Sequence, residues 1–349
     1  MNAIKRLVAP IYSAVHTLPR VASMPSYYPE CKRKWWLRRY CELVWQRVTA
    51  NTTNFYYYGY GMDRLDCAPT HDYVLDDEFW QKVISQNYGW PTNHAILLRD
   101  KYLFALFMAA HKLPSPKIVA YANCGRFYIG DKELPYVAWV SEIMKHGQDV
   151  FVKEATSCCA KGVTHVLDNW PFDEKHFARG KFIVQQAVRN CNQINAIQSK
   201  SVNTLRIVTV VSKKTGKVEL LSPGGLRVGG GADVDNWAAG GLFVGIDEDG
   251  TLQKHGFLKP DYTPPLRRDR QPQTGFAFER TAVPFYREAV ELVKRAHSFM
   301  PEIVTIGWDV ALTPDGPVLI EGNDDWELTL MQMVAGGLRK RFEELGVLK

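Results

Sequence analysis

Three oxygen-bearing side chains near the C-terminus have the types and spacing of a metal site. Asp309 lies in one apolar run, while Glu321 and Asn323 lie in the next. The Pro-Asp-Gly sequence at 314–316 predicts a tight turn between them, because proline fixes φ and glycine can take positive φ. On a hairpin the three side chains would meet on one face. Two carboxylates and an amide oxygen suit Mg²⁺ beside substrate phosphates, although acids that merely face solvent would give the same pattern.

A single arginine, Arg206, interrupts an apolar run at 205–211 that is typical of a buried strand. A buried charge needs a partner. A bound carboxylate or phosphate could provide it through two parallel hydrogen bonds, and a structural salt bridge is the alternative. Two glycine clusters follow, around Arg227 and around Asn236. Glycine lets the backbone approach a ligand closely, so we expect a ligand near both residues.

Two lysines stand where elements begin or end. Lys101 lies near the start of a helical run at 98–107, and Lys153 ends an apolar run at 149–153. A loop of small residues that includes Lys161 follows Lys153. A lysine gives point charge to phosphate oxygens, and small residues let backbone N–H groups come near. An ordinary solvated lysine remains the alternative for Lys101.

The composition is that of an ordinary globular chain. Of its 349 residues, 46% are hydrophobic and 23% charged, a length that predicts two or three domains. The 43 lysines and arginines exceed the 37 acids by six, which favours an anionic ligand without requiring nucleic acid. Seven cysteines form no Cys-x-x-Cys pair, which argues against a zinc ribbon or a disulfide framework. Adjacent Cys158 and Cys159 fit a reducing cytoplasm.

Other patterns narrow the class of protein further. No apolar run approaches the roughly 20 residues of a membrane-spanning helix, and prolines interrupt the first 20 residues, so we expect no signal peptide. The glycine clusters contain no Gly-x-Gly-x-x-Gly opening a helix, which argues against a dinucleotide fold. We expect a cytoplasmic protein.

Helical and strand patterns alternate along the chain and predict a mixed α/β (α+β) fold. The predicted helices are 76–84, 98–107 and 284–300, and the predicted strands are 117–121, 149–153, 181–186 and 205–211. A proline- and arginine-rich stretch at 260–275 is predicted to be a loop. The aromatic cluster at 55–61 favours core and turn over a sugar-stacking surface.

Near the N-terminus, a basic and aromatic helix is predicted at 31–45. Trp36, Tyr40, Leu43 and Val44 recur at helical spacing, with the basic residues largely elsewhere on the wheel. Such a helix could lie on a membrane surface or meet an acidic glycan. The interpretation we favour is a helix that packs these apolar residues on the body of the protein and leaves its basic face in water.

Taken in order, these motifs resemble the ATP-grasp superfamily. Asp on one strand and Glu-x-Asn on the next resembles its magnesium-binding end, and Gly-Trp-Asp-Val-Ala-Leu-Thr-Pro-Asp-Gly-Pro-Val-Leu-Ile-Glu-Gly-Asn at 307–323 is similar to its sugar-transfer-associated branch, found near cell-surface polysaccharide genes. Ser-Val-Asn-Thr-Leu-Arg at 201–206 is the second resemblance, and the likeness covers roughly 95–335. It implies an ATP-grasp fold with a mainly helical N-terminal region at 1–94, a nucleotide-binding lid at 95–187 and a catalytic subdomain at 188–349.

The resemblance also implies roles for particular residues. The metal ligands would be Asp309, Glu321 and Asn323, and the acyl-substrate and catalytic residues Arg206, Arg227 and Asn236. The nucleotide would contact Lys101, Lys153, Lys161, Gln185, Gln186, Ala187 and Val188. Family members often have glutamate where the two glutamines stand, and their phosphate loop is richer in glycine than 155–162, which holds only Gly162.

The implied activity is an ATP-dependent carboxylate–amine ligase that works through an acylphosphate and releases ADP and phosphate. Its cofactors would be ATP and Mg²⁺, with Mn²⁺ as a substitute, and its substrates a small carboxylate and an amine, either of which could be sugar-linked. The setting would be modification of cell-surface polysaccharide or a related metabolite. A carboxylate–thiol ligase and a non-catalytic nucleotide-binding protein of glycan assembly are the alternatives. The residues do not indicate an oligomeric state.

Overall fold

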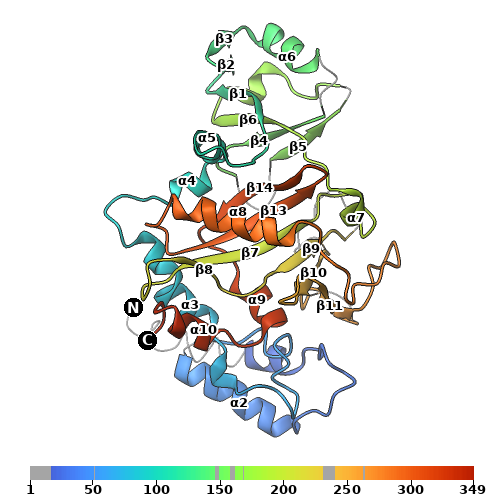
Figure 1. Ribbon diagram of the computed structural model, residues 1–349. Helices are drawn as coiled ribbons and strands as arrows, with labels where there is room; N and C mark the ends of the chain where they lie inside the picture. Colours follow the sequence, from blue (N-terminus) through green and yellow to red (C-terminus); the bar gives the residue numbers. More distant parts are fainter. Residues whose placement is uncertain are drawn as a thin grey trace, which may run out of the picture.

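The computed structural model describes residues 17–50, 52–145, 149–157, 162–167, 169–230, 240–261 and 264–349. Among these residues the chain forms a six-stranded sheet and an eight-stranded sheet, both built of antiparallel pairs. The smaller sheet stands apart from the body of the molecule in Figure 1, and the N-terminal region lies at the opposite end. The fold is therefore α+β, as the sequence patterns predicted.

The smaller sheet comes from one continuous part of the chain. Its strand order is β3 (Lys132–Leu134), β2 (Arg126–Ile129), β1 (Ile118–Asn123), β6 (Lys181–Gln186), β4 (Val150–Glu154) and β5 (Val163–Val166). Helix α6 (Tyr136–Met144) covers it, because Trp139 and Ile143 pack into a core separate from that of the larger sheet. Three of these strands fall where the sequence predicted them.

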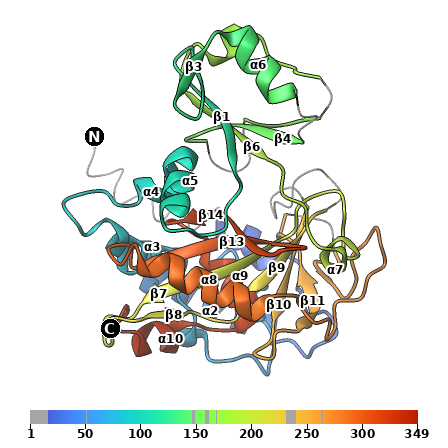
Figure 2. The ribbon, with the colours of Figure 1, turned by 45° about the horizontal axis from the view of Figure 1, so that its top comes forward.

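The larger sheet carries most of the core. Its order is β12 (Arg267–Arg268), β11 (Leu252–Phe257), β10 (Leu242–Ile246), β9 (Gly225–Val228), β7 (Thr204–Val211), β13 (Thr305–Thr313) and β14 (Gly316–Asn323), and β8 (Val218–Leu220) also pairs with β7. Strands β7 and β13 are buried along almost their whole length, as central strands covered on both faces are. Helix α8 (Tyr286–Ser298) lies across this sheet (Figure 2).

The predicted hairpin is present as β13 and β14, joined at the Pro-Asp-Gly turn. Gly316 takes a φ of 115°, which requires glycine. The register places Asp309 opposite Glu321 and Gly307 opposite Asn323. A register shift between Asp309 and Val310 marks a β-bulge, a feature that often re-aims side chains beside active sites.

The helix predicted at 98–107 is two helices, α4 (Ile96–Arg99) and α5 (Lys101–Ala110). Asp100 between them has extended backbone, and its carboxylate accepts from the N–H groups of Tyr102 and Leu103 as the N-cap of α5. The same carboxylate is 3.0 Å from Nζ of Lys181 on β6. Periodicity alone could not show this break, because a good N-cap residue also fits within an apolar helical pattern.

Two other expectations need correction. The predicted loop at 260–275 contains strand β12, which pairs with β11. The described glycines around Arg227 do not face an open ligand space: a Cβ on Gly225 would lie 2.4 Å from the Phe243 ring, and one on Gly229 would lie 2.1 Å from Oγ of Ser201. These glycines are needed because the protein packs on itself there.

The N-terminal region is held against the larger sheet. It contains α2 (Trp36–Ala50) and α3 (Asp76–Lys82), with the short 3₁₀ helices η1 (Thr70–Asp72) and η2 (Ile84–Tyr88). Gln332 on α9 (Leu328–Ala335) accepts from the Val74 N–H and donates to its carbonyl. The region shares one hydrophobic core with the C-terminal helix α10 (Arg339–Glu344). As favoured from sequence, most of the 55–61 cluster is core: Tyr57, Tyr58 and Tyr60 are buried.

Candidate active site

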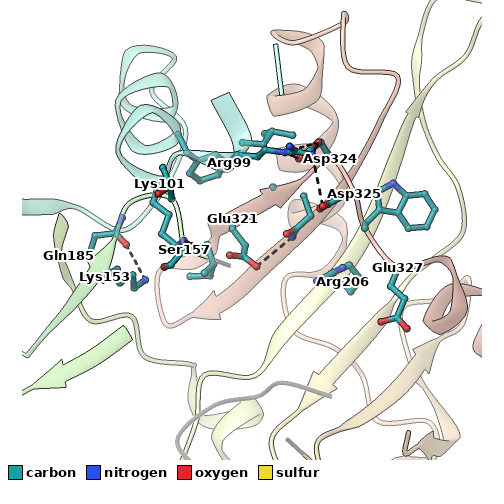
Figure 3. Close-up of a pocket in the computed structure, with 17 residues that line it drawn as sticks. Arg99, Lys101, Lys153, Ser157, Gln185, Arg206, Glu321, Asp324, Asp325 and Glu327 are labelled. Carbon is teal, nitrogen blue, oxygen red and sulfur yellow. Dashed lines mark hydrogen bonds and ion pairs between the residues drawn. The ribbon is translucent and has the colours of Figure 1, made fainter. Parts of the chain in front are cut away.

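A cavity of about 480 Å³ lies where the two sheets face each other (Figure 3). The side of the smaller sheet contributes Lys153, Gln185 and, from α5, Lys101. The larger sheet contributes Arg206, Glu321 and Asn323 from β7 and β14. Residues predicted from distant parts of the sequence therefore line one cavity.

The two lysines lie on the same side of the cavity. Lys153 Nζ donates to Gln185 Oε1 at 3.0 Å, and Lys101 Nζ donates to the Ser157 carbonyl. Burial lowers the pKa of Lys153 to about 8; the Glu321 carboxylate opposes this shift and the charge of Lys101 adds to it. An ammonium group that has lost solvent in this way gains much from an incoming anion.

On the opposite side, charged residues lie next to one another across three strands. Arg206 on β7 is directly opposite Asp309 on β13, which is directly opposite Glu321 on β14. Paired residues of neighbouring strands project from the same face. The sheet register thus brings a guanidinium and two carboxylates together, although they are far apart in sequence.

Asp309 accepts hydrogen bonds from two arginines. Arg206 binds it through Nε at 2.7 Å and Nη2 at 2.9 Å, and Arg227 Nη1 is 2.7 Å from Oδ2. Burial alone would raise the pKa of Asp309, but the two guanidinium groups hold it well below its usual range. Arg206 thus forms a structural salt bridge, which was the alternative left open by the sequence. The partner of Arg206 is Asp309, the residue that the sequence analysis assigned to the metal site.

Glu321 lies in a different electrostatic environment. Burial and the neighbouring Asp309 carboxylate raise its pKa to about 7. Asn323 Nδ2 donates to the Gly307 carbonyl at 3.3 Å, an orientation that leaves its amide oxygen for a ligand. The oxygen donors of Glu321 and Asn323 fit a hard cation such as Mg²⁺. Asp309 fits less well in this arrangement, because both of its oxygens already accept from arginines.

Among the described residues, no group of three or more histidine, cysteine or acidic side chains could hold a metal ion. The predicted set of Asp309, Glu321 and Asn323 contains only two such side chains, because Asn323 is an amide. The larger-sheet wall thus offers two hard oxygen ligands beside a neutralised carboxylate. A third ligand would have to come from elsewhere, and substrate phosphates commonly fill that position.

The segment expected to contact a nucleobase is only partly directed to the cavity. Gln185 lines it, whereas the Gln186 side chain is exposed. The N–H groups of Gln186 and Ala187 donate to the carbonyls of Lys117 and Asp149, at 3.0 and 2.8 Å. Those two N–H groups are used within the protein, so they are not free to bind a base. Val188 follows them and is half-buried.

Two of the predicted site residues, Lys161 and Asn236, lie outside the part of the chain that the structure describes. Arg227, assigned with Asn236 to the acyl substrate, is placed by its bond to Asp309. Its contribution is therefore to hold Asp309 beside Arg206.

Sequence reasoning missed a set of residues just after β14. Asp324 accepts from Arg99 Nε at 3.0 Å and from the Tyr88 hydroxyl, and its carbonyl accepts from Asn87 Nδ2 at 2.7 Å. This network ties the N-terminal region to the end of strand β14, which carries Glu321 and Asn323. The signal was available in the acidic run at 324–327, which directly follows Asn323.

Glu327 is the second omission. It lines the cavity just before α9, and its Oε1 accepts from the Tyr56 hydroxyl at 3.3 Å. Desolvation in the cavity wall raises its pKa, while the charges of Lys259, Arg206 and Arg227 oppose that shift. The N-terminal region thus contributes a side chain beside the cavity.

Together, the antiparallel small sheet, the larger sheet and the lysine-walled cavity between them define an ATP-grasp fold. The model of the family described as sugar-transfer associated ATP-grasp matches residues 172–346, half of the chain. The chain belongs to this family, as the motifs predicted. A comparison with curated proteins finds no match.

Solved structures with a similar fold include several ligases. N5-carboxyaminoimidazole ribonucleotide synthetase from Thermotoga maritima is 12% identical with a TM-score of 0.44, over 78% of this chain and 56% of that one. D-alanyl-alanine synthetase A from Vibrio cholerae is 14% identical with a TM-score of 0.35, over 69% and 66%. The ATP-grasp ligase PsnB, complexed with a minimal precursor, is 10% identical with a TM-score of 0.40, over 72% and 61%. This chain thus spans little more than half the length of the first of them.

Proposed function

We propose that this protein is an ATP-dependent ligase that joins a carboxylate to an amine. The observation that carries the proposal is the division of the cavity into two walls. One wall holds two lysines, of which Lys153 donates to a neutral amide, and the other holds a carboxylate, an amide oxygen and a guanidinium. Family membership adds support, since the family is defined by the ATP-grasp fold.

Lys101 and Lys153 bind phosphate oxygens of ATP in this proposal. The lowered pKa of Lys153 supports the assignment, because an under-solvated ammonium is a strong phosphate ligand when it is protonated. Gln185 then holds Lys153 in place through its side-chain oxygen.

Glu321 and Asn323 would hold Mg²⁺, with Mn²⁺ as a substitute. Asp309 would stabilise the site from its position opposite Glu321 on strand β13. A bound Mg²⁺ supplies charge neutralisation on the transferring phosphate. The raised pKa of Glu321 favours this role, since a bound cation would stabilise its charged form against burial and the neighbouring Asp309 carboxylate.

Arg206 orients the acyl substrate. Asp309 engages its Nε and Nη2 atoms, while the residue also lines the cavity. Asp309 and Arg227 therefore fix the guanidinium in one orientation, which is the preorganisation that charge stabilisation in a transition state requires. The substrate carboxylate would meet the remaining edge of the guanidinium.

The reaction has two steps. A carboxylate oxygen attacks the γ-phosphorus of ATP, and ADP leaves, which forms an acylphosphate. The amine nitrogen then attacks the acyl carbon, phosphate leaves and an amide forms. The amine must lose a proton, and Glu327, which lies in the cavity wall with a raised pKa, is placed to accept it. No side-chain nucleophile is needed.

We place the substrates in the chemistry of sugars, with a uronic acid or an aminosugar as one reactant and a cytoplasmic setting. The family description supports the link to sugar transfer. A carboxylate–thiol ligase would use the same first step, and a non-catalytic nucleotide-binding protein would use none.

The test is an ADP-release screen of amines and amino acids against uronic-acid sugars, with product masses as the second readout. Release that requires both substrates, with an amide product, is the expected result. Glu321→Gln is the matched variant and should abolish turnover while the protein remains folded, because it removes the charge of a metal ligand. Turnover at the wild-type level in folded Glu321→Gln protein would contradict the metal assignment. ATP binding without turnover for any pair would favour the non-catalytic alternative.

A further inference from the structure

Helix α2 exposes an apolar stripe to solvent. Trp45 is 69% exposed and Val48 is 72% exposed, and Leu37 is also exposed. With the exposed Cys41, these residues recur every three or four positions along one side of the 15-residue helix. Positions at this spacing share a helix face. Trp35, just before the helix, and Trp36, its first residue, are 66% and 59% exposed.

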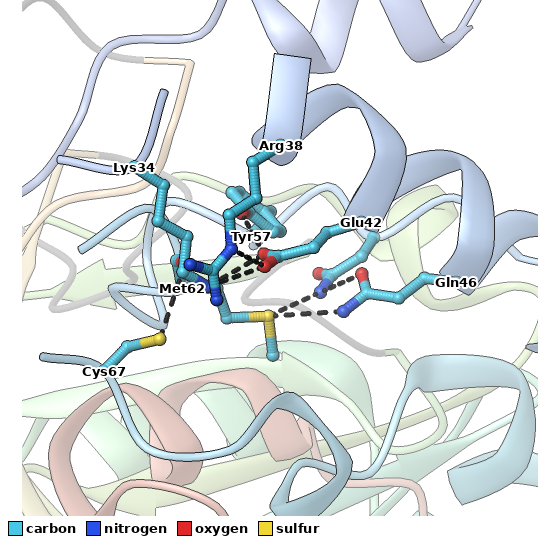
Figure 4. A network of polar contacts seen from close by, with 8 residues as sticks. Lys34, Arg38, Glu42, Gln46, Tyr57, Met62 and Cys67 are labelled. Atoms are coloured by element: carbon cyan, nitrogen blue, oxygen red, sulfur yellow. Dashed lines mark hydrogen bonds and ion pairs between the residues drawn. The ribbon is translucent and has the colours of Figure 1, made fainter. Parts of the chain in front are cut away.

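The opposite face of α2 is buried, and its contacts are largely polar (Figure 4). Glu42 accepts from Lys34 Nζ at 2.8 Å and from the Tyr57 hydroxyl at 2.6 Å. Gln46 is buried, and its Nε2 donates to the sulfur of Met62 at 3.5 Å. Leu43 is the fully buried apolar residue between them.

This orientation matches only half of the expectation that α2 packs its apolar residues on the body of the protein. Leu43 is buried and Val44 packs against the core, but Trp36 and Tyr40 are exposed. An ordinary amphipathic helix buries its apolar stripe and exposes its polar side. Here the polar network fixes the reverse arrangement, so the exposed stripe is available to a partner.

The charge around α2 indicates what kind of partner would bind. Residues 31–50 contain six basic side chains and one acidic one, a formal charge of +5 in a chain whose total is +6. Of these basic residues, Lys32 is exposed, and the side chain of Arg38 is 62% exposed and pairs with Glu42. Lys34 is buried against the same Glu42, and Arg33 pairs with Asp63. Basic residues beside exposed tryptophans are typical of helices that lie in a membrane interface.

We propose that α2 docks this protein onto an anionic membrane surface. The helix would lie along the surface, with Trp45, Val48 and Leu37 among the upper acyl chains and the basic residues at the headgroups. A second copy fits the surface less well, because it would bring two strongly basic segments together. An acidic glycan would match the charge but leave the apolar stripe in water.

The position of α2 agrees with this role. It lies at the end of the molecule remote from the smaller sheet (Figure 1), so docking leaves the cavity between the sheets uncovered. Among the described residues, no helix is long and apolar enough to cross a membrane. The contact would therefore be a surface one.

Vesicle co-sedimentation of the full chain tests the proposal. The vesicles are phosphatidylcholine alone, and phosphatidylcholine with phosphatidylserine at about a third of the lipid. The variant Trp45→Ser/Val48→Ser removes the centre of the stripe, and Trp90→Ser, a 56%-exposed tryptophan outside α2, is the matched control. Circular dichroism and the melting temperature check that each variant is folded. None of these residues lines the cavity, so the result is independent of the ligase proposal.

We expect the wild type and Trp90→Ser to sediment with the anionic vesicles and to partition at least tenfold more weakly to the neutral ones. The double variant should lose about tenfold or more in binding to the anionic vesicles, because it removes two apolar side chains that would be buried in the membrane. A wild type that binds neither vesicle, or a double variant that binds like the wild type, would overturn the proposal. Two other results would also overturn it if the protein did not bind vesicles. One is self-association that depends on concentration and on Trp45, and the other is binding to polygalacturonate that depends on Trp45.

Discussion

On the smaller-sheet wall of the cavity, Lys153 donates to the neutral amide of Gln185, whereas on the larger-sheet wall Arg206 is held by the carboxylate of Asp309. Among the described residues the first cation has no counter-charge in direct contact, and its pKa is lowered. The second has one at hydrogen-bond distance. We infer that the lysine wall is built to receive an anion, while the arginine wall is already balanced and serves to orient. Removing a lysine from the first wall should therefore weaken ATP binding. Removing a charged residue from the second wall should lower the stability of the protein or the rate of the reaction.

The largest effect is expected from Asp309→Ala. The change leaves Arg206 and Arg227 without their carboxylate in a largely buried site, which typically destabilises a protein by about 3–5 kcal/mol. Urea denaturation without nucleotide measures it. Asp325→Asn, at an acid whose side chain is 51% exposed on the same cavity, is the control and should change the free energy of unfolding by less than about 0.5 kcal/mol. Equal losses in the two variants would remove the distinction between the walls.

Arg206→Lys should lower the ligation rate about a hundredfold, or on the order of 3 kcal/mol, with ATP affinity nearly unchanged. Lysine keeps the charge but loses the planar fork that Asp309 holds on two sides. Single-turnover rates and an ATP titration separate the two quantities. A large loss of ATP affinity would place Arg206 on the nucleotide. Unfolding of the variant would mean that the residue is purely structural.

Lys153→Ala should weaken ATP binding by about tenfold to a hundredfold, in line with about 1.5–3 kcal/mol for a charged hydrogen bond. Isothermal titration calorimetry gives the affinity directly. Lys213→Ala and Lys214→Ala, at exposed positions away from the cavity, are the matched controls and should bind like the wild type. If all three variants lost affinity equally, general charge rather than a site would explain the binding.

The smallest effect is expected from pH. Because the pKa of Lys153 is lowered to about 8, its ammonium form is present below that pH and is lost above it. Bound phosphate favours the ammonium, so binding above pH 8 must take up a proton, and affinity should fall about fivefold between pH 8 and pH 9. Lys153→Arg stays charged and should give a flat profile over this range. A wild type with a flat profile would show that Lys153 does not contact the phosphates.

The sequence predicted the elements of the site better than their contacts. The apolar runs and the Pro-Asp-Gly turn were enough for the β13–β14 hairpin, because strand alternation and turn chemistry are local. The opposition of Arg206 and Asp309 depends on strand register between segments about a hundred residues apart, which no local pattern determines. The apolar run around Arg206 could suggest that the guanidinium needed an anionic partner. It could not show that the protein itself supplies that partner.

The same difference explains the outcome for α2. Helical spacing correctly predicted a helix there, and α2 extends to Ala50. Which side of it faces inward depends on Glu42 meeting Lys34 and Tyr57, a tertiary contact. A hydrophobic pattern ranks faces by polarity, so it fails where a polar network is buried and an apolar stripe is not. That failure is itself what points to a binding surface.

Helix α5 is attached to both sheets at once. Its first turn is joined to the smaller sheet, since Asp100 pairs with Lys181 and the Lys101 N–H donates to the Ala155 carbonyl at 2.8 Å. Further along, Phe104 and Met108 enter the core of the larger sheet. The helix therefore connects the two sheets, and its first turn is held by the smaller sheet while its middle is held by the larger one. Lys101 stands at that first turn, so contacts with both halves of the molecule determine where this lysine enters the cavity.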